Sequence, residues 1–277
     1  MRIALALEYP LMQQGGTEVL VQELIRGLSR HCEIVLVSGD RERKELPEEF
    51  SRLIRGHLHW QIGATTAQAA RTLAEELRRQ ELDLAHFHFG GTYEWRSNRF
   101  WQCPIYHLAR SSVPCLSTNH LAVEWLNCGC DPARPGWQKL FFQAFASFSR
   151  SVLYRRLAFE VCVSKHDQQR IVGMFPLFKR KILQRYHSLL RAGTPLPNLH
   201  DRAPVVLCVG TIGGRKAQWI LVEAFGRIAA KHAAWRLDLI GRPGDPTDVA
   251  RINEIVATHG LAGRINLPGR LSDEETI

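Results

Sequence analysis

Short apolar runs alternate along the chain with longer segments in which apolar residues recur every three or four positions. The runs at about 3–7, 33–38, 82–87, 114–118 and 159–164 are typical of buried parallel strands. The periodic segments at about 17–30, 66–80, 137–157 and 165–174 are typical of amphipathic helices. Strands that alternate with helices predict an α/β fold built on a doubly wound parallel sheet.

The same alternation begins again after residues 191–204, where Gly193, Pro195 and Pro197 predict a linker. Strands are expected at 205–210, 236–241 and 264–267, and a helix is expected to begin near Ala217. We therefore expect two Rossmann-like domains, residues 1–190 and an incomplete second domain at 205–277.

A glycine-rich turn joins the first strand of the second domain to its helix. Gly210, Gly213 and Gly214 precede Arg215 and Lys216, which bring positive charge to the turn. Backbone N–H groups at a glycine turn and a helix start bind anions well. Gly241 closes the next strand, at the strand end where open α/β sheets place their ligands. These features predict a nucleotide or phosphate-ester site.

Two standard glycine motifs do not fit this turn. A P-loop needs a Gly-Lys-Ser/Thr ending, but Arg215 separates Gly214 from Lys216, and Ala217 stands at the hydroxyl position. The spacing of Gly210 and Gly213 is also out of register with a dinucleotide fingerprint. An ordinary βα turn with two solvated basic residues stays open as the alternative interpretation.

The amino-terminal segment has a second candidate site. An apolar run at 3–7 leads through a loop to Gly15-Gly16-Thr17-Glu18, which opens a helix. Glu18 suits the first turn because its negative charge complements the helix dipole, and the glycine pair leaves room for a ligand at the backbone.

Taken in order, several segments resemble family 4 of the retaining, nucleotide-sugar-dependent glycosyltransferases, which have the two-domain GT-B fold. They are Met1–Ala6, Gly15–Glu18, Leu82–His88, Val161–Ser164, Val209–Lys216, Glu223–Phe225, Leu239–Gly241 and Ile265–Glu275. The resemblance is strongest in residues 1–40 and 205–277 and thin between about 90 and 160.

The resemblance implies transfer of a sugar from a UDP- or GDP-sugar to a glycan or lipid-linked acceptor, as in polysaccharide or cell-envelope biosynthesis. It implies no cofactor, and the chain has no Asp-x-Asp, which suits a metal-independent site. The family continues beyond the position of Ile277 with units that carry a Glu, seven residues, Glu motif. A non-catalytic nucleotide-binding remnant is therefore an alternative. A sugar-nucleotide epimerase or dehydrogenase is disfavoured because no dinucleotide fingerprint follows the first strand.

The resemblance also implies roles for single residues. Lys216 takes the position of the donor-phosphate lysine. Thr211 stands where the family has a partner arginine, and Arg215 could supply the positive charge of that arginine. The other implied donor contacts are Gly16, Gly210 and Gly241. His120 matches a cleft histidine that hydrogen-bonds the transferred sugar or the acceptor, and the implied acceptor contacts are Gly15, His88 and Glu124. For each histidine, the alternative is a structural residue whose hydrogen bonds are made within the protein.

Composition agrees with a globular enzyme: 277 residues, 45% hydrophobic and 23% charged. The apolar run after Arg2 is too short for a signal peptide and no apolar stretch reaches membrane-spanning length, so a cytoplasmic protein is expected. Seven cysteines without a C-x-x-C pair indicate reduced thiols. No metal is expected, and a zinc site on Cys128 and Cys130 with Cys103, His107 and His120 is a disfavoured alternative, because these residues have no recognisable ligand spacing.

The basic charge is concentrated in one segment. Residues 137–191 hold eleven Lys or Arg against two carboxylates, an excess equal to the +9 of the whole chain. Their first helix has one aromatic face, which we interpret as core-facing, with a solvated basic side opposite that includes Lys139 and Arg150. The aromatic face comprises Trp137, Phe141, Phe145, Phe148 and Val152. Peripheral contact with the inner membrane surface is the alternative. Nucleic acid is not expected, because no recognisable binding module accompanies the charge.

Overall fold

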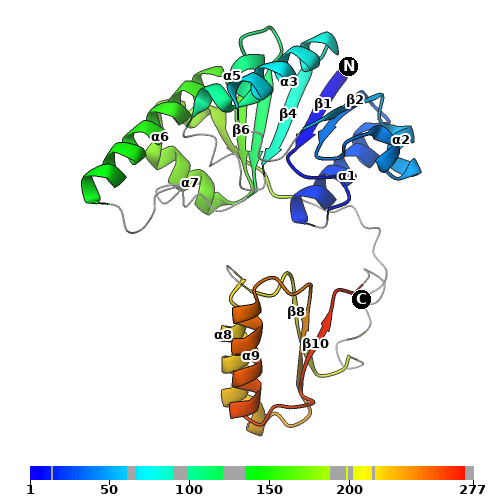
Figure 1. Cartoon of the computed structure of the whole chain (residues 1–277), viewed down its shortest axis with the longest axis vertical. Coiled ribbons are helices and arrows are strands. Elements are labelled where there is room, and N and C mark those ends of the chain that lie inside the picture. Colours follow the sequence, from blue (N-terminus) through cyan, green and yellow to red (C-terminus); the bar gives the residue numbers. More distant parts are fainter. Residues whose placement is uncertain are drawn as a thin grey trace. The chain divides into compact units, whose positions relative to one another are not determined.

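The computed structural model describes residues 1–13, 15–60, 66–89, 99–120, 135–187, 198, 202–213 and 216–271. The chain forms two compact units, Met1–Arg191 (unit 1) and Ala192–Ile277 (unit 2). Figure 1 shows that each unit is a parallel sheet with helices packed on it.

Unit 1 is built on a seven-stranded parallel sheet of order β3-β2-β1-β4-β5-β6-β7. The strands are β1 (Arg2–Leu7), β2 (Glu33–Ser38), β3 (Gly56–His59), β4 (Leu84–Phe89), β5 (Cys115–Asn119), β6 (Phe159–Cys162) and β7 (Ile182–Gln184). The strand order reverses between β1 and β4, and sheets of this kind bind ligands at the carboxyl ends of the strands beside such a reversal.

Helices cover the sheet of unit 1 on both faces. They are α1 (Gly16–Leu28), α2 (Glu48–Leu53), α3 (Ala67–Arg79), α5 (Pro104–Leu108), α6 (Gly136–Arg156) and α7 (Lys165–Met174), with short 3₁₀ turns at Arg43–Glu45, Phe100–Gln102 and Pro176–Lys181. Because side chains alternate along a strand, Leu5 of β1 packs with α1 and α2, whereas Ala4 and Ala6 face the core built with α3, α5 and α6.

The strands and helices predicted for residues 1–174 are confirmed, with their ends shifted by a few residues. Two strands and two helices are additional: β3 and β7, and α2 and α5. Both additional strands lie at the edges of the sheet and are four and three residues long. Their hydrophobic pattern is therefore too short to be recognised.

The expectation for α6 is wrong about which face packs. Trp137, Phe141 and Phe148 of its aromatic face are exposed, while Arg150 is buried and forms an ion pair with Glu160 of β6. The side chains that pack inward are Ala146, Ser149, Arg150, Leu153 and Tyr154, and Phe145 and Val152 are half-buried. Periodicity shows which residues share a helix face, but an opposing carboxylate decided that the face with Arg150 turns inward.

Unit 2 contains a three-stranded parallel sheet of order β10-β9-β8. Its strands are β8 (Val205–Val209), β9 (Arg236–Ile240) and β10 (Ile265–Gly269), and its helices are α8 (Gln218–Ile228), a 3₁₀ turn (Ala229–Lys231) and α9 (Pro246–Thr258). The predicted pairing of 205–209 with 236–240 is confirmed, with Val205 opposite Arg236. In Figure 1, α8 and α9 lie along one face of the sheet, over the core of this unit.

Candidate functional site

The glycine turn of unit 2 lies where β8 ends and α8 begins. Gly210 (φ 151°) and Gly213 (φ 118°) adopt conformations in which other residues are strained. Gly241 at the end of β9 lies directly against the turn, because a Cβ atom there would stand 2.0 Å from the carbonyl oxygen of Gly210. Ile212 and Pro243 extend the contact as a parallel bridge. The two loops therefore converge at one corner, as the sequence predicts.

Gln218 holds the turn in this shape, and sequence reasoning missed it. Its buried side chain accepts a hydrogen bond from the backbone N–H of Gly213 (3.0 Å) and donates one to the carbonyl of Thr211 (2.9 Å). The first residue of α8 thus ties the helix start to the turn that precedes it. A polar residue in the first turn of this helix was the available signal.

Lys216 is exposed at the same corner. Its Cε atom lies 3.8 Å from the position that a Cβ of Gly210 would take, so the side chain runs back along the turn. A lysine, a glycine turn and a helix start at the carboxyl ends of parallel strands form the usual surroundings of a bound phosphate. Arg215 and Gly214 lie outside the described residues.

The start of α1 in unit 1, like the turn of unit 2, contains glycines next to the first residues of a helix. Gly15 caps the helix in an extended conformation, and a side chain there would collide with the carboxylate of Glu18 at 2.3 Å. Gly16 has no atom within 4 Å of an added Cβ, so the backbone at this point is open. Glu18 is buried, and burial raises the pKa of its carboxyl group.

Four histidines form a row that begins in the middle of β4 and continues past the carboxyl ends of β5 and β7. We call it the histidine row: His86, His88, His120 and His187. Neighbouring rings have centroids 4.0, 5.4 and 5.0 Å apart. Nδ1 of His88 is 3.2 Å from Nε2 of His120, and Nδ1 of His120 is 3.2 Å from Nε2 of His187. His86 bonds through Nε2 to Thr118 Oγ1 at 2.8 Å.

Burial keeps the histidine row neutral at pH 7. The pKa of His86 and of His120 is lowered to about 4, mainly by burial and in part by the positive charge that the neighbouring His187 carries when it is protonated. The pKa of His88, which is 1% exposed, is well below the ordinary value for the same two reasons. His187 is exposed at the end of the row, and its pKa is lowered by partial burial.

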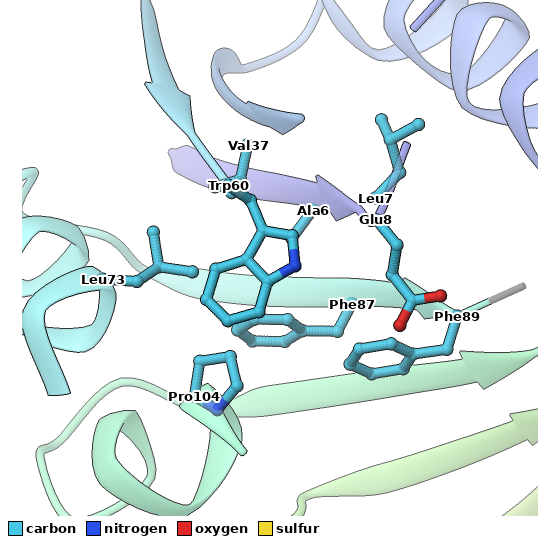
Figure 2. A pocket seen from close by; sticks show the side chains of 9 residues that line it. All are labelled: Ala6, Leu7, Glu8, Val37, Trp60, Leu73, Phe87, Phe89 and Pro104. Atoms are coloured by element: carbon cyan, nitrogen blue, oxygen red, sulfur yellow. The ribbon is translucent and has the colours of Figure 1, made fainter. Parts of the chain in front are cut away.

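Two hollows lie elsewhere in unit 1. Figure 2 shows the first, where the indole of Trp60 meets Phe87, Phe89 and Pro104, with the carboxylate of Glu8 beside it. Its volume of about 10 Å³ suffices for about one water and excludes a sugar. The second, about 610 Å³, is an open hollow between β3 and α3 at the far edge of the sheet from the histidine row.

The structure thus gathers the predicted site residues into two groups. Gly15, Gly16, His88 and His120 lie at the carboxyl ends of β1, β4 and β5 in unit 1, beside the reversal of strand order. Gly210, Lys216 and Gly241 converge in unit 2. Glu124 lies outside the described residues. His187 was not predicted, because it follows a three-residue strand that has no recognisable pattern.

In the described part of the chain, no group of three or more His, Cys, Asp or Glu side chains is arranged to hold a metal ion. The same residues contain no helix that is long and apolar enough to cross a membrane.

Two compact units, each built on a parallel sheet, are typical of the GT-B fold of glycosyltransferases. Solved structures of glycosyltransferases are similar to the chain over most of its length. A glycosyltransferase from Rickettsia africae matches with a TM-score of 0.67 at 16% identity, covering 98% of this chain and 69% of the other. The lipopolysaccharide outer core galactosyltransferase WaaB matches with a TM-score of 0.61 at 14% identity, covering 99% of this chain and 70% of the other. HepE from Anabaena, in complex with UDP and glucose, matches with a TM-score of 0.61 at 16% identity, covering 98% of this chain and 70% of the other.

The chain belongs to Glycosyltransferase Family 4, whose family model matches residues 14–187. No curated protein sequence is significantly similar to it. The matched residues contain the start of α1 and the whole histidine row.

Proposed function

We propose that this protein transfers a sugar from a UDP- or GDP-sugar to a hydroxyl group of a glycan or lipid-linked acceptor, with retention of configuration and without a metal. The observation that carries the proposal is the corner of unit 2 where the glycine turn, the start of α8 and Lys216 meet. The solved structure of HepE, which contains UDP and glucose, supports a nucleotide-sugar donor.

The donor diphosphate would bind at this corner. As the glycosidic bond breaks, negative charge grows on the leaving nucleoside diphosphate, and the ammonium group of Lys216 and the N–H groups of the turn stabilise it. A lysine and backbone dipoles can do this without a metal ion, and the absence of an Asp-x-Asp from the sequence supports that assignment. Retention is proposed from membership of the family alone.

The acceptor would bind at the carboxyl ends of the strands in unit 1. Gly15 and Gly16 leave the backbone at the start of α1 open to polar groups, and the neutral histidine row lies at the adjacent strands, with His88 buried behind His120 and His187 exposed at its end. A neutral imidazole both donates and accepts a hydrogen bond, which suits a sugar hydroxyl. A role in polysaccharide or cell-envelope assembly is consistent with the galactosyltransferase WaaB among the similar folds.

We further propose that α6 contacts the inner, anionic membrane surface, where a lipid-linked acceptor would reside. In Figure 1 its amino-terminal end extends beyond the sheet. Four of its large apolar side chains are more than half exposed. These are Trp137 (71%), Leu140 (67%), Phe141 (65%) and Phe148 (57%), which we call the α6 surface. Residues 135–159 contain no Asp or Glu, and Arg155 and Arg156 end the helix. Aromatic side chains with positive charge favour an anionic lipid interface.

The donor site is tested with Lys216→Ala. We expect kcat/KM for sugar transfer to fall by about two to three orders of magnitude, the usual effect of losing one contact to developing charge. Lys231→Ala, which removes an exposed lysine from the 3₁₀ turn after α8, is the matched control and should leave transfer unchanged. Equal rates for Lys216→Ala and the wild type would remove Lys216 from the donor site.

A non-catalytic nucleotide-binding protein is the second candidate, favoured by Thr211 at the position where the family has a basic residue. Calorimetry with UDP and GDP separates the candidates. Nucleotide binding without transfer to any acceptor supports the second candidate, and the absence of both binding and transfer contradicts both.

A further inference from the structure

The open hollow of about 610 Å³ in unit 1 lies along the free edge of its sheet. β3 is the last strand in the sheet order, and no strand pairs with its far side in the described part of the chain. The hollow is lined by the consecutive residues 57–60, which are the end of β3 and the position after it. Because consecutive side chains point to opposite faces of a sheet, a space that touches all of them lies beside the strand rather than over one face.

One face of α3 forms the opposite wall of the hollow. Ala69, Thr72 and Glu76 recur every three or four residues along the helix and line the space. Trp60 and Leu73 line it as well, and these buried side chains also line the small hollow in Figure 2, so they separate the two spaces. We call the larger space the β3–α3 groove. Its strand side is about 13 Å long, at about 3.3 Å per residue.

Strand β3 is held in place from the side of β2. Nε2 of His57 lies 2.9 Å from Oγ of the buried Ser38, and Nδ1 of His59 lies 2.9 Å from the carbonyl oxygen of Asp40. Both contacts supplement the ladder that joins β3 to β2. The edge is therefore already extended, and a ligand that pairs with it avoids the entropic cost of ordering the strand.

The free edge of β3 favours an extended polypeptide as the ligand. Along a strand, alternate residues direct their N–H and C=O groups outward, and the backbone of another strand repeats these donors and acceptors at the same spacing. Several peptide-binding domains recognise their ligands by strand addition of this kind. Main-chain hydrogen bonds then supply affinity, and the side chains that point into the groove supply specificity.

Glu76 gives the β3–α3 groove a negative charge. It is the only Asp or Glu among the described residues that line the groove, and no Lys or Arg is among them. Its half-buried carboxylate has no hydrogen bond or ion pair with any residue that the structure describes. A partly desolvated carboxylate is stabilised by a cation, so the charge favours a ligand that brings a Lys or Arg side chain.

We propose that the β3–α3 groove binds an extended, basic segment of a partner protein, which pairs with the free edge of β3 and places a Lys or Arg side chain against Glu76. The surface is made by β3 and α3 of unit 1 alone. It therefore needs neither the donor corner nor the histidine row, and it goes beyond the proposed sugar transfer by assigning a docking site for another protein.

The charge of the ligand is tested with random octapeptides displayed on phage and selected against the whole chain. The selected sequences should carry a Lys or Arg. In fluorescence polarisation their affinity should fall roughly tenfold for Glu76→Gln, the effect of losing one hydrogen bond to a charged group. Glu75→Gln, at the adjacent exposed position of α3 outside the groove, is the matched control and should leave the affinity unchanged. Selection of no peptide, or equal affinity for Glu76→Gln and the wild type, would overturn the proposal.

Strand pairing is tested with two N-methylated forms of the tightest selected peptide, one methylated on alternate amides and the other on the remaining amides. Only one set of peptide N–H groups faces β3, so one form should lose binding and the other should retain it. Bound peptide should also slow amide hydrogen exchange in residues 56–60. Equal binding of the two forms contradicts strand addition. A dimer in light scattering that protects the same residues without peptide would identify a second copy as the occupant and overturn the assignment to a partner protein.

Discussion

At the scale of single residues, the shape of the donor corner depends on backbone positions that tolerate no side chain. Gly241 and Gly213 have positive φ angles, and an added Cβ would meet neighbouring atoms at 2.0 Å and 2.9 Å. For Gly241 the obstructing atom is a backbone carbonyl oxygen, which cannot move without displacing Gly210. The close approach of the two loops is therefore a property of these glycines.

We expect Gly241→Ala to destabilise unit 2 by about 2–4 kcal/mol, because steric overlap adds to the cost of a positive φ angle. Gly263→Ala is the control: its φ of 77° is also positive, but no atom lies within 4 Å of an added Cβ. It should cost about 1–2 kcal/mol. Urea unfolding followed by hydrogen exchange of residues 205–269 measures both. Equal losses would show that the contact with Gly210 is unimportant.

At the scale of elements, α6 has two halves with different surroundings. Its carboxyl-terminal half is anchored to β6 by the buried pair of Arg150 and Glu160, and Lys181 caps the helix end by donating to the carbonyls of Tyr154 and Leu157. Three of the four side chains of the α6 surface, Trp137, Leu140 and Phe141, lie in the amino-terminal half, and Phe148 lies just beyond the middle of the helix. The inward turn of Arg150 therefore places the aromatic side chains outward, which is what the membrane proposal requires.

Flotation with vesicles tests the α6 surface. The wild type should bind vesicles of phosphatidylglycerol and phosphatidylcholine, bind pure phosphatidylcholine less, and lose binding at high salt. Phe141→Glu should weaken binding roughly tenfold or more, because a buried phenyl group contributes about 1.5–3 kcal/mol. Ile228→Glu, at a half-exposed position of α8, is the control. A dimer in light scattering that Phe141→Glu dissociates would instead identify the surface as a contact between two copies.

At the scale of the whole molecule, the two units should respond differently to acid. The histidine row of unit 1 has pKa values of about 4 at His86 and His120, below the ordinary value of 6.5. As the pH falls below 6.5, the unfolded chain takes up protons that the folded row does not, so the free energy of unfolding decreases. The loss proceeds down to about pH 4 and reaches about 1.4 kcal/mol per pH unit for each histidine.

Hydrogen exchange at pH 7 and pH 5 measures this effect for each unit separately. Unit 1 should lose protection between these values by more than unit 2, which has no such row among its described residues. His120→Gln should reduce the pH dependence of unit 1. His166→Gln, an exposed position of α7, should leave it unchanged. Equal loss in both units would show that the row does not set the acid response.

The sequence by itself determined the features that depend on local chemistry. The alternation of apolar runs and helical periods predicted the parallel α/β architecture, because burial on a strand and on a helix has different spacing. The convergence of the loops at Gly210 and Gly241 was predicted because both follow buried strands, and parallel strands end at one edge. The ordered motifs were sufficient to recognise the family.

Tertiary structure alone decided three further features. The edge strands β3 and β7 exist because a neighbouring strand supplies their hydrogen bonds. The outward face of α6 follows from the position of Glu160 on another element. The histidine row joins residues that are 32 and 67 positions apart in sequence. Periodicity describes the surroundings of a residue along its own element, whereas these features depend on which distant segment lies beside it.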